Sequence, residues 1–421
     1  MRRTIVFVVV GLVVASCSSV SEEDHEAALA EAVQLQEQVS GLESTVDEVE
    51  GQLATTETEL ATTQDEVVGL EDDLVVAEED ASRAVERYEE LTDLSAIPNT
   101  SAATLIFVLS RETLLCGVAG TFPGFSQTQL DGSTTGFDAD FCRAVAAAVL
   151  GDADDVEFVP VTAAERFNAV RFGGVDVLFR NTTWTLNRDA ALGQQVDFGP
   201  TTFYDGQQLM GTADQYEITS TGADVDGARV CVNENTASAD RVVEYAASFG
   251  TAVEIVNSAT NLDLLLNGTC DLITTDGSGL AIARETAIQA GEIAAGDLVI
   301  FPSTPISREP LGPVYRQGDT VWADIINWVI YTTIIAAEKG ISSSNIDTIE
   351  WDAEAQRLFG TEGEHAVTLG LDLDAFYQVI KQVGNYTEIF DRNLNDFGFV
   401  ATGSANTVYT QGGLLYAPPV R

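Results

Sequence analysis

Hydrophobic and polar positions follow two different patterns, which divide the chain near residue 97. Between residues 21 and 95, apolar or small residues recur at alternating steps of three and four, the spacing of a coiled-coil seam. The two seam positions read Ala32, Val39, Val46, Leu53, Leu60, Val67, Leu74, Ala81, Tyr88 and Leu35, Leu42, Val49, Thr56, Thr63, Leu70, Ala77, Ala84, Leu91. Residues 17–97 are therefore predicted to form a helical coiled-coil stalk. An acidic disordered tether is the alternative, because the flanking charges are nearly all acidic and leave few ion pairs between helices.

The segment Ile97–Thr100 contains a proline and ends this pattern. After it, short apolar runs alternate with amphipathic helical stretches. The predicted strands are Leu114–Val118, Val156–Val161, Val175–Phe179, Arg229–Val232, Val253–Val256 and Asp271–Thr275, and the predicted helices include Asp138–Leu150, Ala163–Phe172 and Ala237–Phe249. A strand–helix–strand–helix–strand order occurs twice, so residues 98–421 are predicted to form an α/β domain of two lobes with parallel strands.

The N-terminal residues have the pattern of an export signal. Arg2 and Arg3 precede the apolar run Ile5–Val14, which is too short to span a bilayer, and no other stretch is expected to do so. The run ends in small residues followed by Cys17, as in a bacterial lipoprotein signal. Residues 1–16 are therefore predicted to be removed and Cys17 to carry a lipid, which would anchor the protein on the outer face of the cytoplasmic membrane. An ordinary secretory signal is the alternative.

Charge and composition narrow the class of partner. Among 421 residues, 66 are Asp or Glu and 20 are Lys or Arg, which gives a formal net charge of -46. Such a surface repels phosphate backbones and disfavours nucleic acid as a partner. The two histidines, His25 and His365, are far apart in the sequence, and no metal or cofactor is expected. No nucleophile and base stand in a catalytic context, so an enzyme is not expected either.

The most informative polar cluster follows the predicted strand Val175–Phe179 and reads RNTTWTLNR over residues 180–188. A guanidinium fork with hydroxyl and amide neighbours suits a carboxylate, because the fork binds both oxygens and the neighbours fill the remaining acceptor sites. Ligands of open α/β sheets bind outside the carboxyl ends of strands, where this cluster lies. An arginine paired with a structural aspartate is the alternative.

Residues 104–421 resemble the solute-binding proteins of polar amino-acid ABC transporters, and most of all the general L-amino-acid-binding branch. The matching segments are CGVAGTFPGF at 116–125, GFDADFCRAVAAAVLGD at 136–152, AAERFNAV at 163–170, RNTTWTLNRD at 180–189, CDLITTDGSGL at 270–280, EPLGPVYRQGD at 309–319, LGLDLDAFY at 369–377, KQVGNYTEIFDRN at 381–393 and GGLLYAPPVR at 412–421. The resemblance implies the two-lobed type 2 periplasmic-binding-protein fold, in which the lobes close on a ligand by a hinge.

The resemblance also implies roles for individual residues. Arg188 and Thr183 would bind the α-carboxylate of the ligand, and Asp276 would bind its α-ammonium. Asn181 would offer the ammonium a further partner, and the ring of Phe122 would cover the ligand. Without the resemblance, Asp276 would be interpreted as a helix cap.

Three more residues complete the implied binding set. Thr236 lies in a loop of the second lobe at the start of a helix, where N–H groups can meet a carboxylate. Arg180 is typical of this branch, is expected near the ligand side chain, and favours acidic ligands and their amides. A structural ion pair is the alternative for Arg180. Trp184 is expected either as a lid over the ligand or as a core residue.

The family analogy also divides the globular region into lobes. Lobe one is expected to comprise residues 104–206 and 304–421, and lobe two residues 207–303. Beyond the predicted lipid site, four cysteines allow three pairings, and an even number in an exported chain indicates disulfides. Pairing within each lobe joins Cys116 to Cys142 and Cys231 to Cys270. Buried free thiols are the alternative.

The resemblance implies that the chain captures an L-amino acid outside the cytoplasm and delivers it to an ABC permease, behind which an ATPase works. The expected partners are the ligand, the permease, the membrane through the lipid, and a second copy through weak association of the stalk. Three alternatives stay open. A ligand-sensing adaptor would share the site but not the partner, a lyase of the cyclohexadienyl dehydratase type would need a general acid in the cleft, and a structural lipoprotein would bind no ligand.

Overall fold

The computed structural model describes residues 102–190, 193–232, 238–258, 262–360 and 365–421, together with parts of the segment 26–60. The chain divides into one unit within residues 1–83 and another within residues 84–421. The export signal, Cys17, the seam beyond residue 60 and Thr236 lie outside the described residues.

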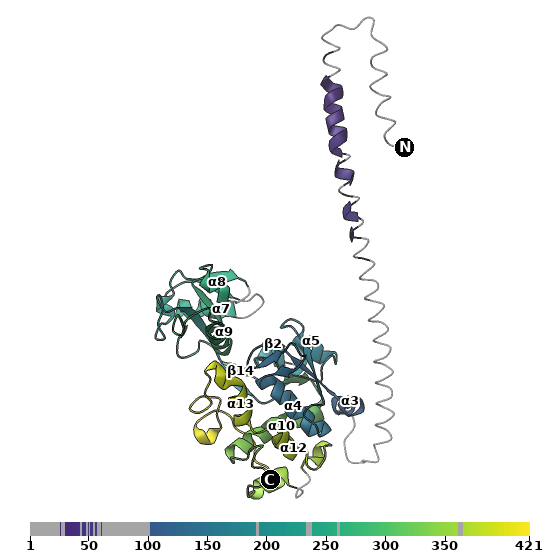
Figure 1. Ribbon diagram of the computed structural model, residues 1–421, viewed down its shortest axis with the longest axis vertical. Coiled ribbons are helices and arrows are strands. Elements are labelled where there is room, and N and C mark those ends of the chain that lie inside the picture. The colour runs from purple at the N-terminus through teal and green to yellow at the C-terminus, as the bar shows by residue number, and fades with distance from the viewer. Residues whose placement is uncertain are drawn as a thin grey trace. The chain divides into compact units, whose positions relative to one another are not determined.

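The first unit contains a helix. The described positions between residues 30 and 53 are all helical, as are positions 55, 56 and 60 (Figure 1). The seam residues among them are exposed, with exposed fractions between 45% and 66%: Leu35, Val39, Leu42, Val46, Val49, Leu53 and Leu60. The predicted helix is confirmed over this segment, and its association into a coiled coil remains a prediction.

The first lobe is built on a five-stranded sheet in the order β5-β1-β6-β15-β7. β1 (Leu114–Val118) pairs in parallel with β5 (Val156–Pro160) and β6 (Val177–Leu178). β15 (Val314–Arg316) runs antiparallel to both β6 and β7 (Val196–Phe198). All but one residue of β1 are buried, as expected for a strand covered on both faces.

The second lobe repeats this arrangement in the order β11-β10-β12-β9-β13. β10 (Arg229–Val232) pairs in parallel with β11 (Glu254–Asn257) and β12 (Leu272–Asp276). β9 (Gln207–Thr212) runs antiparallel to both β12 and β13 (Leu298–Phe301). Each sheet therefore has three parallel strands, then one reversed strand, then an edge strand that again runs in the direction of the first three. The predicted two-lobed α/β fold is confirmed.

The chain crosses between the lobes twice. β8 (Phe203–Asp205) leads from the first sheet to the second, and β14 (Glu309–Leu311) leads back. The two crossing strands pair with each other as a two-stranded antiparallel sheet. A small three-stranded sheet of β2 (Thr121–Phe122), β3 (Ser126–Thr128) and β4 (Thr134–Thr135) lies next to β1 in the sequence.

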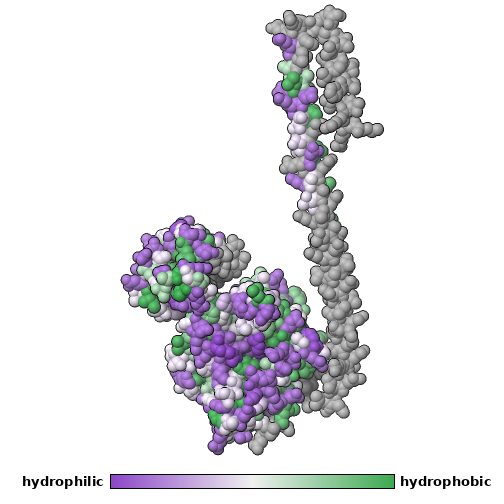
Figure 2. All heavy atoms as spheres, in the orientation of Figure 1, coloured by the Kyte–Doolittle hydropathy of each residue, from purple (hydrophilic) through white to green (hydrophobic). Residues whose placement is uncertain are grey.

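Helices surround both sheets. In lobe one these are α3 (Ala103–Arg111), α4 (Phe137–Leu150), α5 (Arg166–Arg171), α6 (Leu186–Asp189), α10 (Thr320–Glu338), α11 (Ala353–Phe359), α12 (Ala375–Gln382) and α13 (Tyr386–Leu394). In lobe two they are α7 (Ser238–Ser248), α8 (Leu262–Leu266) and α9 (Gly277–Ala290), labelled in the teal part of Figure 1. Figure 2 shows mostly hydrophilic residues on the visible face of the globular part, in keeping with the acidic composition.

α10 is long and apolar enough to cross a membrane, by length and composition alone. The side chain of Asp319 caps its start by accepting the N–H of Trp322 at 3.1 Å. The helix packs against α4, α12 and α13, and its buried face belongs to the main hydrophobic core. The expectation that no other stretch has such a composition is thus wrong, but the packing shows that α10 is a core helix.

Both disulfides form within a lobe, in the expected pairs. Cys116 of β1 is joined to Cys142 of α4, with a Cα–Cα distance of 6.0 Å. Cys231 of β10 is joined to Cys270, which precedes β12, with a Cα–Cα distance of 5.8 Å. Each bridge therefore ties a central strand to a neighbouring element of the same lobe.

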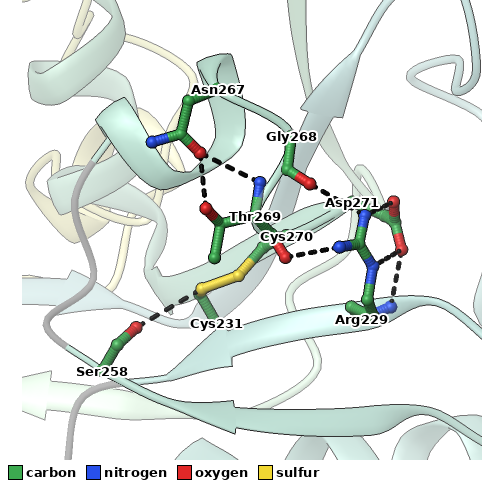
Figure 3. The surroundings of a disulfide bond; sticks show 8 residues. All are labelled: Arg229, Cys231, Ser258, Asn267, Gly268, Thr269, Cys270 and Asp271. Carbon is green, nitrogen blue, oxygen red and sulfur yellow. Dashed lines mark hydrogen bonds and ion pairs between the residues drawn. A yellow bond between two sulfur atoms is a disulfide. The ribbon is translucent and has the colours of Figure 1, made fainter.

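The second bridge is accompanied by an ion pair that also joins β10 to the turn before β12 (Figure 3). The guanidinium of Arg229 donates to both oxygens of Asp271, at 3.1 Å from Nε and 2.7 Å from Nη2. It also donates to the carbonyl oxygens of Gly268 and Thr269, at 3.0 and 2.8 Å. These bonds fix the turn before β12, whose other end carries Asp276.

Candidate functional site

A strained loop follows β6 and carries the polar cluster singled out in the sequence. Asn181 has a φ of +42°, a conformation that asparagine tolerates better than most residues. Its backbone N–H donates to Oδ2 of Asp138 at 3.1 Å. The amide of Asn181 is buried and has no hydrogen-bond partner among the described residues, so both of its polar atoms remain available to a ligand.

Asp138 is the residue that holds this loop, and its role was not anticipated. It lies in the first turn of α4 and is 4% exposed. Burial raises the pKa of Asp138 to about 7, although the N–H of Asn181 and the charge of Arg180 oppose the shift. A buried carboxylate beneath the loop thus fixes the backbone on which Arg180 and Asn181 stand.

Arg188 lies on α6, and its guanidinium points back to the loop. Nη1 of Arg188 donates to the carbonyl oxygen of Thr183 at 2.7 Å. Thr183 in turn bridges to Leu311 of the crossing strand β14, and the N–H of Trp184 donates to the carbonyl of Pro310 at 2.9 Å. The segment between Thr183 and Arg188 is therefore attached directly to the connection between the lobes.

The guanidinium of Arg188 is largely shielded from solvent. Burial lowers the pKa of its guanidinium; the carboxylates of Glu309 and Asp276 oppose this shift, whereas the cation of Arg241 adds to it. The guanidinium forms no ion pair with a described residue and keeps donors free for an anion.

Among the described residues, one hydrogen bond anchors the Arg180 side chain. Its Nε donates to the carbonyl oxygen of Val161 at 2.8 Å. Burial lowers the pKa of Arg180, and the carboxylate of Asp138 partly offsets the effect. The structural ion pair considered for Arg180 does not form, since none of the described carboxylates lies within ion-pair distance of it.

Asp276 ends β12 and precedes the first residue of α9. Its side chain makes no capping hydrogen bond, which removes the helix-cap interpretation. Burial and the neighbouring carboxylates of Asp205 and Glu309 raise the pKa of Asp276, while the cations of Arg241 and Arg188 oppose the shift. Asp276 from one lobe and Arg188 from the other therefore act on each other electrostatically without a direct ion pair.

A second set of charged groups surrounds Asp276 and was not predicted from the sequence. Nη1 of Arg241, on α7, contacts Oε1 of Glu309 at 2.7 Å, and Glu309 is buried on β14. Oδ1 of Asp205, on β8, accepts the N–H of Ser278 at 3.3 Å. These contacts join lobe two to both crossing strands. Glu309 stands in a motif quoted above, but a one-dimensional pattern gives no sign of its partner.

The aromatic candidates take different positions. Phe122 stacks on Phe125 with ring centroids 5.2 Å apart. A Cβ placed on Gly279, in the first turn of α9, would lie 3.8 Å from Cζ of Phe122, so this ring stands close to the Asp276 end of α9. Trp184 stacks in parallel on Phe198 and is 42% exposed, so it is not a buried core residue, and its role as a lid stays a prediction.

The described residues contain no group of three or more His, Cys, Asp or Glu side chains placed to hold a metal ion. The structure gathers Arg180, Asn181, Thr183 and Arg188 on one loop and its short helix. Asp276, in the second lobe, interacts electrostatically with Arg188. An anion site and a cation site therefore stand on opposite lobes, which suits a zwitterion.

Comparisons with known proteins agree with this geometry. A family model described as bacterial extracellular solute-binding proteins, family 3, matches residues 114–341. The glutamate/glutamine/aspartate/asparagine-binding protein BztA of Rhodobacter capsulatus is 39% identical over 328 residues, which cover 76% of this chain and 94% of BztA. The general L-amino acid-binding periplasmic protein AapJ of Rhizobium johnstonii is 40% identical over 336 residues, which cover 76% of this chain and 94% of AapJ.

Among solved structures, the ABC transporter / periplasmic binding protein from Brucella ovis with glutathione bound has a TM-score of 0.68 and 35% sequence identity. The match covers 76% of this chain and 99% of the Brucella protein. Sequence and structure thus agree over the whole two-lobed region, and the chain belongs to family 3 of the bacterial extracellular solute-binding proteins.

Proposed function

We propose that this chain, an extracytoplasmic amino-acid-binding subunit of an ABC importer, captures L-amino acids with acidic or amide side chains between its two lobes and delivers them to the permease. The observation that carries the proposal is the separation of two opposite charges. The desolvated Arg188 lies on lobe one and Asp276 on lobe two, and neither is paired with the other. An α-amino acid has a carboxylate that suits Arg188 and an ammonium group that suits Asp276.

Binding and closure are coupled in this arrangement. Arg188 and Thr183 bind the α-carboxylate from lobe one, and Asp276 binds the α-ammonium from lobe two. Neither lobe alone satisfies both ends of the ligand, so the closed form gains its extra affinity only when a complete amino acid is present. The closed lobes then present the surface that the permease recognises. We also propose that the lobes divide as expected from the sequence, because β9 begins at Gln207 and β13 ends at Phe301.

The proposed ligand class rests on one further residue. Arg180 stands beside Asn181 at the mouth of the same loop, with its Nη donors uncommitted. BztA is named for glutamate, glutamine, aspartate and asparagine, all of which carry a carboxyl or amide side chain. The Brucella protein holds glutathione, a γ-glutamyl peptide that ends in the same α-amino acid head group. The family and its named relatives are binding proteins of transporters and not enzymes.

Calorimetric titration of the ligand-stripped full chain with the twenty L-amino acids tests the proposal. We expect tight one-to-one binding of glutamate, aspartate, glutamine or asparagine. Equal binding of many side chains would keep the importer function and remove the role of Arg180 in selectivity. The absence of any amino-acid binding would refute the proposal.

We further propose that Cys17 carries a lipid that anchors the protein to the membrane. Its position after a short apolar run and small residues supports this. A Cys17→Ser chain is then expected to lose its lipid and move from the membrane fraction to the soluble fraction of the cell, while its amino-acid affinity stays unchanged. Metabolic labelling with a radioactive fatty acid measures the change, and an unlabelled wild-type chain would contradict it.

The exposed seam of the N-terminal helix supports a second copy of this chain as its partner. The apolar residues described there recur at heptad spacing and are exposed. The association is expected to be weak, because acidic flanks of two copies repel each other.

A further inference from the structure

Three guanidinium groups of lobe one lie together without a carboxylate partner. The Cζ atoms of Arg166 and Arg188 stand 4.8 and 5.7 Å from the ring centroid of Phe167. Arg180 reaches the same region, because its Nε donates to the carbonyl of Val161, which lies between β5 and α5. None of the three forms an ion pair with a residue that the structure describes.

Such a cluster is unexpected in a chain this acidic. Carboxylates outnumber basic side chains 66 to 20, so partners for structural arginines are plentiful. Elsewhere in the described residues, the arginines in contact with a carboxylate are Arg111, Arg143, Arg229, Arg241, Arg284 and Arg392. Arg171, Arg308, Arg316, Arg357 and Arg421 also lack such a contact with a described carboxylate. Arg166, Arg180 and Arg188 differ from them because they lie together and burial lowers the pKa of all three, which suits an anionic partner from outside the chain.

Arg166 is the member of the cluster that the proposed function has not used. Its Nε is enclosed by protein and has no hydrogen-bond partner among the described residues. Burial lowers the pKa of its guanidinium, and the cations of Arg188 and Arg180 lower it further, while Asp276 opposes the shift. An enclosed charge beside two like charges is costly until an anion joins it.

Arg188 and the other two arginines face different tasks, because only Arg188 has a role in the proposed function. Arg188 donates a hydrogen bond to the carbonyl oxygen of Thr183 and, in the proposed function, binds the α-carboxylate. Arg166 and Arg180 remain, and both stand just beyond the carboxyl ends of strands, where ligands of such sheets bind. Two guanidinium groups offer a single carboxylate charge-assisted donors on both of its oxygens.

We propose that Arg166 and Arg180 bind a second carboxylate of the ligand, so that the site prefers α-amino acids with a distal carboxylate over the corresponding amides. The inference rests on the proposed function and narrows its ligand class. The distal carboxylate can belong to an acidic side chain or to the C-terminal end of a γ-glutamyl peptide, and both present the same chemistry to the arginines.

Arg166→Gln in the full chain tests this, with Arg171→Gln as a matched control. Both arginines lie on α5 and stand over the ring of the following phenylalanine, but Arg171 is exposed and outside the cluster. Calorimetry would measure L-glutamate, L-glutamine and glutathione with each chain. We expect Arg166→Gln to weaken glutamate about thirtyfold or more and glutamine less than about threefold, and Arg171→Gln to change neither.

The ligand whose binding is lost shows whether the second carboxylate belongs to an acidic side chain or to a peptide. Loss confined to glutamate assigns the carboxylate to a side chain, and loss confined to glutathione assigns it to the peptide; both support the proposal. Equal loss of glutamate and glutamine, or unchanged affinity for all three ligands, would overturn it.

The wild-type chain keeps the test valid even where the Gln variant does not fold. Glutamine binding as tightly as glutamate in the wild type overturns the second-carboxylate proposal alone. Binding of none of the three ligands overturns the proposed function as well. Arg166→Lys retains the charge and is expected to keep glutamate ahead of glutamine.

Discussion

Arg188→Met is expected to weaken amino-acid binding at least about a hundredfold. The substitution keeps most of the apolar side chain and removes the guanidinium that meets the α-carboxylate. In the proposed function this carboxylate then loses its bidentate charged partner, and truncation of one partner of such a buried pair typically costs about 2–5 kcal/mol. The loss should be similar for every amino acid, because all share the α-carboxylate, and calorimetric titration measures it directly.

Folding is expected to survive this change. The native chain holds the Arg188 guanidinium desolvated and near the cation of Arg241, so its removal relieves a cost that partly offsets the lost bond to the carbonyl of Thr183. The melting temperature should stay within about 3 °C of the wild type. Arg171→Met, an exposed change on α5, serves as the control. Near-normal affinity of the Arg188→Met chain would exclude the proposed carboxylate clamp.

The regular elements were largely predictable because apolar runs and helical periodicity are local signals. β1 and β10 have the bounds expected from their buried runs, and α4 begins one residue earlier than predicted, at Phe137. The antiparallel strands β7 and β15 were not predicted, since runs of three residues carry too little pattern to be recognised. The predicted helix over 163–172 shortens to Arg166–Arg171, because its first residues form a turn.

The sequence proposed candidate binding residues one by one, but it gave no sign of the residues that support them. Asp138 holds the N–H of Asn181 across 43 positions of sequence, and Arg241 meets Glu309 across two different lobes. No periodicity or spacing links residues that meet only after folding. Arg166 was hidden for a different reason, because a charged residue at the start of an amphipathic helix is the ordinary composition of a solvated face.

The crossing strand β14 contacts residues near both Arg188 and Asp276. β14 carries Glu309, which is tied to α7 of lobe two, and its Pro310 and Leu311 are bonded to the segment that ends in Arg188. The same strand therefore contacts the segment that carries Arg188 in one lobe and a charged neighbour of Asp276 in the other. In the proposed function, a hinge movement at this strand would change the surroundings of Arg188 and Asp276 together, and closure would then act directly on affinity.

Asp276→Asn is expected to remove the pH dependence of binding together with most of the affinity. In the ligand-free chain, burial and the carboxylates of Asp205 and Glu309 raise the pKa of Asp276 above its ordinary value of 3.8. The ligand ammonium needs the ionised form, so binding should release a proton wherever Asp276 starts out protonated. Affinity should therefore increase as the pH rises through the raised pKa, by up to about tenfold per unit. Calorimetry from pH 5 to pH 9, in buffers of different ionisation enthalpy, measures both affinity and proton release.

The stability of the ligand-free chain should move in the opposite direction. Because the pKa of Asp276 is higher in the folded chain than in the unfolded one, the unfolded state ionises first as the pH rises above 3.8. The wild type then loses stability up to the raised pKa, whereas the Asp276→Asn chain avoids that loss and should melt at a higher temperature than the wild type at pH 8, with little difference at pH 4. Asp263→Asn, an exposed change on α8, controls for the loss of one negative charge. Proton-free binding by the wild type, with equal affinity at pH 6 and pH 8, would contradict the prediction that a carboxyl group with a raised pKa ionises to bind the ammonium.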